Sequence, residues 1–142
     1  MVDTFSFLRY HLVFSTKNRF PFLEPEQQEH CWAYIGAVVR ENGGTPIAVG
    51  GMRDHVHILL GLPHTMALSA MVRKIKSCSS AGLKKLFPDL KGLSWQDGYG
   101  IFTVSQSQVE TVRNYILNQK KHHKTQDYSG ELSAILKKHQ LT

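Results

Sequence analysis

The segment His55–Leu60 constrains the fold more than any other part of the chain. It reads His-Val-His-Ile-Leu-Leu and follows the polar, glycine-containing turn Gly50–Asp54. Successive side chains of a strand point to opposite faces, so the two histidines share one face and the valine and the isoleucine share the other. Imidazoles at this spacing can converge on one metal ion, although an ordinary strand with one buried and one exposed histidine is an equally open interpretation. The segment predicts one strand of a hairpin.

The remaining periodic segments surround this strand with helices and further strands. The predicted elements are a strand at 5–15, a helix from Pro25 to the stop at Asn42–Gly44, strands at 45–49 and 55–60, a helix at 67–87, a strand at 99–104, and a helix that opens with a capping box at Ser107–Glu110 and runs to His123. This order is the split βαβ arrangement of ferredoxin-like α+β folds. It predicts an antiparallel sheet with helices packed on one face.

Length and composition indicate a single soluble domain. The chain has 142 residues, and no apolar run approaches the roughly 20 residues that span a bilayer. The N-terminus lacks a basic segment followed by an apolar one, so secretion is not expected. Cys31 and Cys78 fall on separate predicted helices without zinc-site spacing, and we expect both to be reduced core thiols. We therefore expect a cytoplasmic protein without a membrane contact.

Basic residues exceed acidic ones and are clustered. Seventeen Lys and Arg against eleven Asp and Glu give a formal net charge of +6. Such patches attract phosphate backbones, although a solvated basic surface without a ligand has the same composition. The candidates for contact with nucleic acid are Arg9, Lys17, Arg19, Arg73, Lys74, Lys76, Lys120 and Lys121.

The last predicted helix carries a second candidate for chemistry. Tyr115 and Gln119 are four residues apart, so they share one helix face immediately before the basic residues 120–124. A tyrosine at the rim of the core, with its hydroxyl in water, is the alternative interpretation.

Four stretches taken together resemble a known family, the single-tyrosine HUH transposases of insertion sequences, which include the repeat-associated tyrosine transposases. The stretches are Tyr10–Lys17, the His55-Val56-His57 motif, Trp95-Gln96-Asp97-Gly98-Tyr99-Gly100, and Tyr115-x-x-x-Gln119. They occur in the family's order and span most of the chain. The resemblance implies a transposase domain at 1–126. The remaining residues, 127–142, are predicted from their own pattern to form a partly helical C-terminal tail that Leu132, Ile135 and Leu136 would dock.

The resemblance also implies an activity and the residues that carry it. The expected function is cleavage and rejoining of single-stranded DNA at hairpin-bearing element ends through a 5′-phosphotyrosine intermediate. By resemblance, Tyr115 is the nucleophile, and His55, His57 and Gln119 hold one Mg²⁺ or Mn²⁺ ion. The implied partners are single-stranded DNA with imperfect hairpins and a second subunit. In such a homodimer, the tyrosine helix of one subunit can complete the histidine site of the other.

Two other functions remain open from the residues alone. One is a non-catalytic nucleic-acid-binding module on the same fold, which would bind without metal and tolerate loss of His55. The other is a metal-dependent phosphoesterase that uses water as nucleophile, in which the hydroxyl of Tyr115 would be dispensable. Phe20 and Trp95 are further candidates for stacking on bases, or ordinary core and rim residues.

Overall fold

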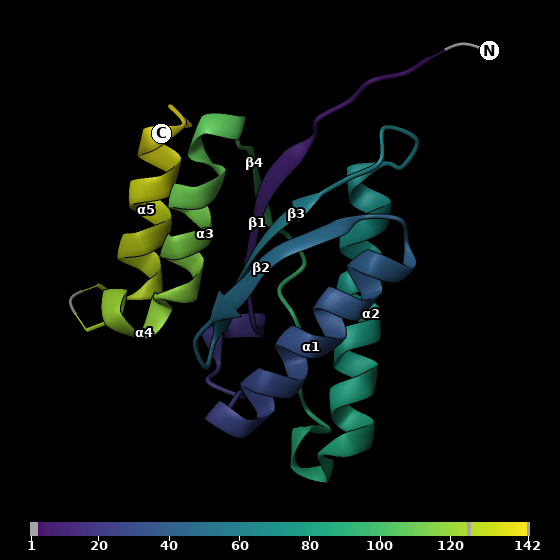
Figure 1. Cartoon of the computed structure of the whole chain (residues 1–142). Helices are drawn as coiled ribbons and strands as arrows, with labels where there is room; N and C mark the ends of the chain where they lie inside the picture. The colour runs from purple at the N-terminus through teal and green to yellow at the C-terminus, as the bar shows by residue number, and fades with distance from the viewer. Residues whose placement is uncertain (1–2, 125, 142) are drawn as a thin grey trace.

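Four strands form one antiparallel sheet in the order β2-β3-β1-β4 (Figure 1). The structure is a computed structural model that describes residues 3–124 and 126–141. The strands are β1 (Arg9–Ser15), β2 (Thr45–Gly51), β3 (His55–Gly61) and β4 (Gly100–Thr103). The predicted α+β class and the ferredoxin-like order are confirmed, with β1 beginning four residues later than expected.

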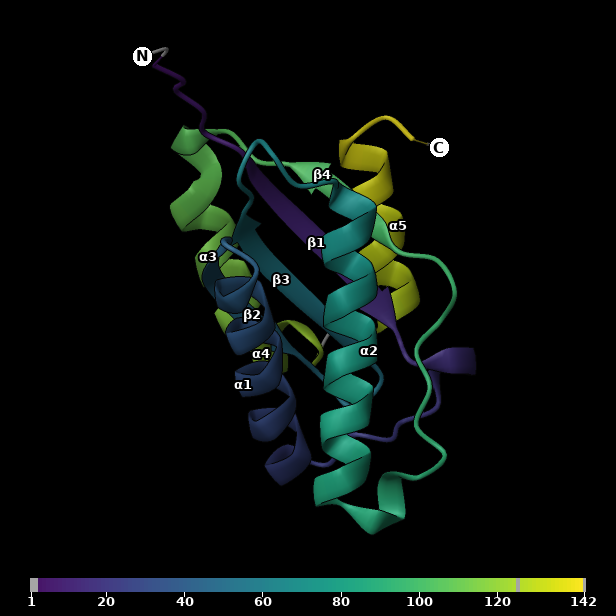
Figure 2. The same ribbon diagram turned by 90° about the vertical axis from the view of Figure 1, so that its right-hand side faces the viewer.

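Helices cover both faces of the sheet, which differs from the expected one-sided arrangement. On one face lie α1 (Pro25–Glu41) and α2 (Leu68–Leu86), and on the other lie α3 (Val109–Leu117), α4 (Gln119–His122) and α5 (Tyr128–Lys138) (Figures 1 and 2). Short 3-10 turns occur at Lys17–Arg19, Pro88–Leu90 and Gln106–Gln108. The second layer covers the other side of β3, a strand whose seven residues are all buried.

The main core lies between the sheet and the α1–α2 pair. Leu12 and Phe14 of β1 and Ile58 of β3 meet fully buried residues of α1 and α2 there. A capping box between Glu24 and Gln27 begins α1, because the glutamate side chain accepts from the first turn and the glutamine accepts from the Glu24 backbone N–H. This layer covers one face of the sheet, and the site lies on the other face.

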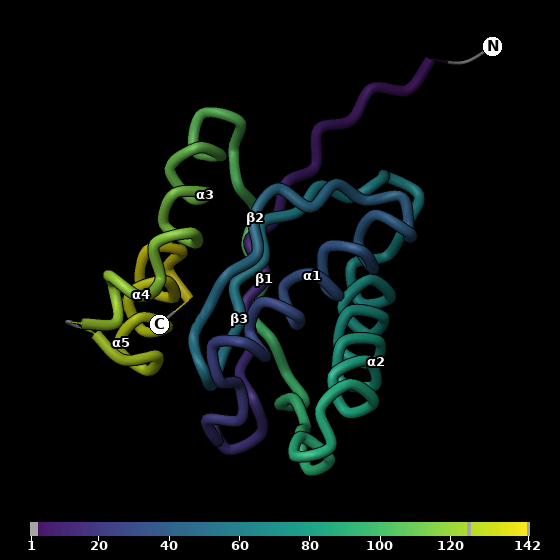
Figure 3. Tube along the Cα trace, turned by 60° about the horizontal axis from the view of Figure 1, so that its bottom comes forward, coloured from purple at the N-terminus to yellow at the C-terminus, as the bar shows by residue number. Residues whose placement is uncertain are grey.

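The opposite face holds two smaller apolar clusters with polar residues between them. Leu59 packs with Ile116 of α3, and Val13 packs with Tyr128 of α5. The residues assigned to the C-terminal tail thus include a helix that is docked on the sheet, as the apolar pattern of its sequence predicted. Figure 3 shows α3, α4 and α5 together on this side of the strands.

Three local predictions differ from the structure. The predicted helix 107–123 divides at Asn118, whose φ of −109° and ψ of 28° are not helical. No side-chain hydrogen bond caps α3, so the predicted capping box does not form. Cys31 is buried as expected, but Cys78 is exposed because it lies on the outer side of α2.

In the described part of the chain, no helix has the length and apolarity to cross a bilayer.

The close approach of α3 to the sheet depends on Gly50. A Cβ at this position would lie 2.5 Å from the backbone oxygen of Ile116, an atom that cannot move without the helix. We expect Gly50→Ala to lower the free energy of unfolding by about 1–3 kcal/mol, the usual cost of overpacking. Urea unfolding measures this. The matched control is Gly36→Ala in α1, where a Cβ meets nothing within 4 Å and should stabilise by about 0.5–1 kcal/mol. Equal stability of Gly50→Ala and wild type would contradict this packing.

Candidate active site

The two histidines of β3 point into the layer between the sheet and α3–α5. Both side chains are fully buried, with 0% exposure. Their Nε2 atoms face the same centre: Nε2 of His55 lies 3.0 Å from Oε1 of Gln119, and Nε2 of His57 lies 2.8 Å from Oε1 of Glu131. The shared face predicted from strand alternation is therefore confirmed.

The other ring nitrogen of each histidine is held by a neighbour. Nδ1 of His55 lies 2.8 Å from Oδ1 of Asp54, and Nδ1 of His57 lies 2.8 Å from Nε2 of His11. Such contacts fix the orientation of an imidazole and leave Nε2 for a ligand. His11 of β1 thus belongs to the support of the site.

Tyr115 and Gln119 reach the same centre from the α3–α4 segment. The two side chains stay on the same side of this segment despite the break at Asn118, because the Asn118 N–H still donates to the carbonyls of Asn114 and Tyr115. The ring of Tyr115 lies 5.7 Å from that of His57. The phenol, the carboxamide and both imidazoles therefore meet within one chain.

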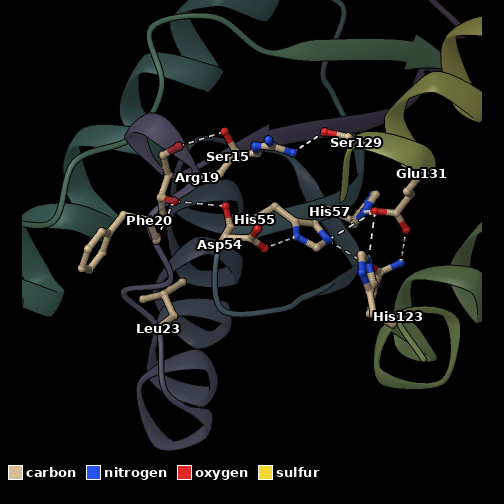
Figure 4. Close-up of polar contacts among 12 residues, drawn as sticks. Ser15, Arg19, Phe20, Leu23, Asp54, His55, His57, His123, Ser129 and Glu131 are labelled. Carbon is tan, nitrogen blue, oxygen red and sulfur yellow. Dashed lines mark hydrogen bonds and ion pairs between the residues drawn. The ribbon is translucent and has the colours of Figure 1, made fainter. Parts of the chain in front are cut away.

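Glu131 of α5 lies at the middle of this cluster, and sequence reasoning missed it. Its side chain is 2% exposed and accepts hydrogen bonds from Gln119 Nε2, at 3.0 Å, and from the hydroxyl of Tyr115. His123 also points toward it, with Nε2 at 3.3 Å from Oε1 (Figure 4). A single glutamate in an amphipathic helix gives no sequence signal, because spacing alone cannot show that this position faces β3.

The charges in the cluster follow from these contacts. Burial and the neighbouring His57 lower the pKa of His11 to about 3, and burial also lowers the pKa of His57, so both rings are neutral at pH 7. Burial opposes ionisation of His55, but Asp54 and Glu131 outweigh it and raise its pKa to about 9. Hydrogen bonds from the histidines likewise outweigh burial and hold the pKa of Glu131 below its usual range. A carboxylate and an imidazolium thus compensate each other inside the protein.

The donor set fits a divalent cation. One donor atom each from His55, His57 and Glu131 lies within 4.8 Å of the others, and the carboxamide oxygen of Gln119 contacts the same space. Imidazole nitrogens combined with carboxylate and amide oxygens suit Mn²⁺, and the oxygens suit Mg²⁺. These side chains can therefore hold the metal that the sequence resemblance implied.

Two cavities border the cluster. One, of about 480 Å³, is lined by His11, Tyr115 and Glu131 and lies between α3, α5 and the end of β4. The other, of about 700 Å³, runs beside Gln119 and is lined in part by Trp32 and by the lysines at 120, 121 and 124. Both give a ligand room to reach the buried side chains.

The candidate DNA-binding cations are spread over the molecule. Lys120 and Lys121 are exposed on α4 next to the site. Arg73 and Lys74 are exposed on α2, on the opposite face of the sheet (Figure 2). The other four lie at the two ends of β1 or face the loop before β4: Arg9, Lys17, Arg19 and Lys76.

Lys76 and Arg19 are among the candidate cations that are already engaged within the chain. Lys76 Nζ donates to the carbonyls of Gln96 and Gly98 at 2.7 and 2.8 Å, so it ties the loop before β4 to α2. Arg19 donates to the hydroxyl of Ser129 at the start of α5 (Figure 4). These contacts favour a structural role for both side chains.

The Trp95–Gly100 motif also has a structural role. Trp95 is 7% exposed, packs edge-on against Phe14 with ring centres 5.0 Å apart, and donates to Ser79. The side chain of Gln96 accepts from the Ser15 N–H at 2.6 Å. Trp95 is therefore a core residue, whereas Phe20, at 58% exposure, remains open to solvent.

Comparison with known proteins identifies the family. The family model described as "Transposase IS200 like" matches residues 4–119. The chain is 30% identical over 117 residues to the ISDra2 transposase TnpA of Deinococcus radiodurans, an alignment that covers 79% of this chain and 84% of the relative. It is 27% identical over 132 residues to the transposase for insertion sequence element IS200 of Salmonella typhimurium, covering 89% and 84%.

Solved structures agree with this result. A crystal structure described as a transposase of Deinococcus radiodurans superposes with a TM-score of 0.68 at 27% identity, over 84% of this chain and 95% of that one. The REP-associated tyrosine transposase bound to a REP hairpin shares the fold, with a TM-score of 0.63 at 19% identity, over 87% and 74%. The chain is thus a member of the IS200-like, single-tyrosine transposase family.

Proposed function

We propose that the chain is a transposase that cleaves and rejoins single-stranded DNA through a 5′-phosphotyrosine intermediate. One observation carries the proposal: a phenol, a carboxamide and two imidazoles from β3, α3 and α4 converge in one buried cluster. The family membership of the chain supports DNA as the substrate.

In the proposed reaction Tyr115 is the nucleophile. Its oxygen forms a bond to the scissile phosphorus, the bond from phosphorus to the 3′ oxygen breaks, and a 3′ hydroxyl leaves after taking a proton from solvent. Burial and the adjacent Glu131 raise the pKa of the phenol, so it is protonated at pH 7 and must lose its proton as it attacks. One phosphodiester replaces another, so the free energy of the bond is conserved and the strand can be rejoined without ATP.

His55, His57 and Gln119 are the proposed metal ligands. A divalent ion held there supplies Lewis-acid polarisation of the scissile phosphate. The chain's own part is to present the ligands in a fixed arrangement: Asp54 and His11 orient the two rings, and burial excludes bulk water. Mg²⁺ or Mn²⁺ fits these donors.

The proposed path of the DNA strand is the cavity beside Gln119. Lys120 and Lys121 line it, and Trp32 offers a surface for base stacking. We expect the double variant Lys120→Ala/Lys121→Ala to bind a single strand more weakly. The slope of log K against the logarithm of the salt concentration should become shallower by about 1–2, since each phosphate contact contributes roughly 0.7. Fluorescence anisotropy at several salt concentrations measures this. The control is Lys84→Ala with Lys85→Ala on α2, which are exposed far from the site. Equal salt slopes for the two variants would rule out this path.

The proposed partners are DNA hairpins and a second subunit. The solved structure of the REP-associated tyrosine transposase is bound to a REP hairpin, which supports an imperfect hairpin as the element recognised here. Because Tyr115 meets His55 and His57 within one chain, the arrangement supports cleavage within a subunit, and a dimer would not need to exchange its tyrosine helices. The non-catalytic binding module and the water-dependent phosphoesterase remain the competing functions.

The deciding experiment mixes the full chain with hairpin-bearing single strands and Mg²⁺ or Mn²⁺. The expected product is a protein–DNA adduct that survives denaturation, together with a free 3′ hydroxyl on the released strand. Binding that persists in EDTA without an adduct would favour the binding module. Cleavage without an adduct would favour the phosphoesterase.

A further inference from the structure

Glu131 accounts for more polar contacts in the cluster than any of the predicted site residues. It comes from α5, outside the residues 4–119 that match the family model. We infer that Glu131 is a further ligand of the metal through Oε1, and that its Oε2 positions the nucleophile Tyr115. This inference rests on the proposed function and adds a residue to its site.

The spacing of the donor atoms supports ligation. Oε1 of Glu131 lies 2.8 Å from Nε2 of His57 and 3.3 Å from Nε2 of His55. Oε1 of Gln119 lies 3.0 Å from the same atom of His55. Neighbouring ligands of an octahedral ion with bonds of about 2.0–2.1 Å are roughly 3 Å apart. The carboxylate oxygen therefore occupies the distance from the imidazoles that a shared ion requires.

The second carboxylate oxygen faces the nucleophile. Oε2 accepts from the hydroxyl of Tyr115 and from Nε2 of Gln119 at 3.0 Å. Since the carboxamide nitrogen is directed to Glu131, its oxygen is left facing His55, the orientation that ligation needs. One side chain thus sets the position of the phenol and the rotation of the glutamine amide.

Electrostatics favour the same assignment. An imidazole must be neutral to bind a metal, so two histidine ligands and an amide would place no formal charge against a buried dication. A carboxylate supplies a negative charge and the hard oxygen that Mg²⁺ prefers. Glu131 is 2% exposed, and a buried carboxylate needs a cationic or hydrogen-bonding partner. The cavity of about 480 Å³ beside Glu131 and Tyr115 leaves open space next to the carboxylate while α5 stays docked.

The test measures metal affinity without DNA. Free Mn²⁺ is followed by electron paramagnetic resonance during titration of the full chain and of Glu131→Gln. We expect the variant to bind Mn²⁺ at least tenfold more weakly, because even residues behind the ligands change metal affinity by about 10–100-fold. The matched control is Glu110→Gln on α3, whose side chain is 74% exposed and which should bind like wild type. Thermal unfolding in EDTA shows whether each variant is folded.

A second variant provides a positive signal that a purely structural role would not produce. Glu131→Cys should gain affinity for Zn²⁺ relative to Mn²⁺ when compared with wild type, since a thiolate is the softer ligand. Unchanged Mn²⁺ affinity in a folded Glu131→Gln variant, or an unchanged metal preference in Glu131→Cys, would overturn the inference and leave the roles of Tyr115 and the histidines intact. Wild-type chain without measurable Mn²⁺ binding would overturn the metal site and this inference together.

Discussion

Tyr115→Phe is expected to abolish the covalent protein–DNA adduct and to lower strand cleavage by more than about 1,000-fold, as loss of a nucleophile does in other enzymes. The substitution removes only the hydroxyl that contacts Glu131, and it keeps the ring packed beside His57 and His122. Binding of the hairpin strand should therefore stay within about threefold of wild type. Denaturing gels with labelled DNA measure the adduct, and anisotropy measures binding.

Tyr128→Phe is the matched control for this prediction. Tyr128 is the other tyrosine near the cluster, with its ring 4.6 Å from that of His55, and phenylalanine retains this contact. We expect this variant to form the adduct. If the adduct is lost in Tyr128→Phe but kept in Tyr115→Phe, the nucleophile is Tyr128 of α5 and not Tyr115. Cleavage that persists in Tyr115→Phe without any adduct would instead identify water as the nucleophile.

His57→Ala is expected to weaken Mn²⁺ binding by more than about 100-fold and to reduce cleavage to the level seen in EDTA, because a ligand should matter more than the residues that orient it. The substitution also removes one hydrogen-bonding partner from each of His11 and Glu131. Isothermal titration with Mn²⁺ measures the first effect, and the adduct assay measures the second.

The control for His57→Ala is His64→Ala. His64 is exposed on the loop after β3, so its removal should change neither metal affinity nor adduct formation. Unfolding in EDTA separates loss of the ligand from loss of the fold. Full cleavage by a folded His57→Ala variant, or equal cleavage by wild type with and without EDTA, would contradict metal dependence.

The sequence predicted the elements whose pattern is local. Alternation in 55–60 placed His55 and His57 on one face of β3, and the four-residue spacing of Tyr115 and Gln119 placed them on one helix face. Both patterns depend on backbone geometry over a few residues, so they hold whatever the rest of the chain does. The order of strands and helices, read in the same way, was sufficient for the sheet topology.

Features that depend on packing could not be predicted in this way. The second helical layer follows from the need to cover both sides of β3, and a run of apolar residues does not show which helix covers which side. The break at Asn118 and the engagement of Lys76 with loop carbonyls are likewise decided by neighbours distant in sequence. Charge and clustering made Lys76 a candidate DNA contact, but they could not reveal that its Nζ donates to the carbonyls of Gln96 and Gly98.

Residue type and local spacing by themselves placed the two imidazoles on one strand face, and the phenol and the carboxamide on one helix face. Only the tertiary structure decided that Glu131, 74 residues after His57, joins them. The position of that carboxylate depends on the path of the chain after His123 and on the docking of α5 against Val13 and Phe102. Docking is a balance of apolar burial between distant segments, and no periodicity within α5 encodes which of its polar side chains ends up facing the site.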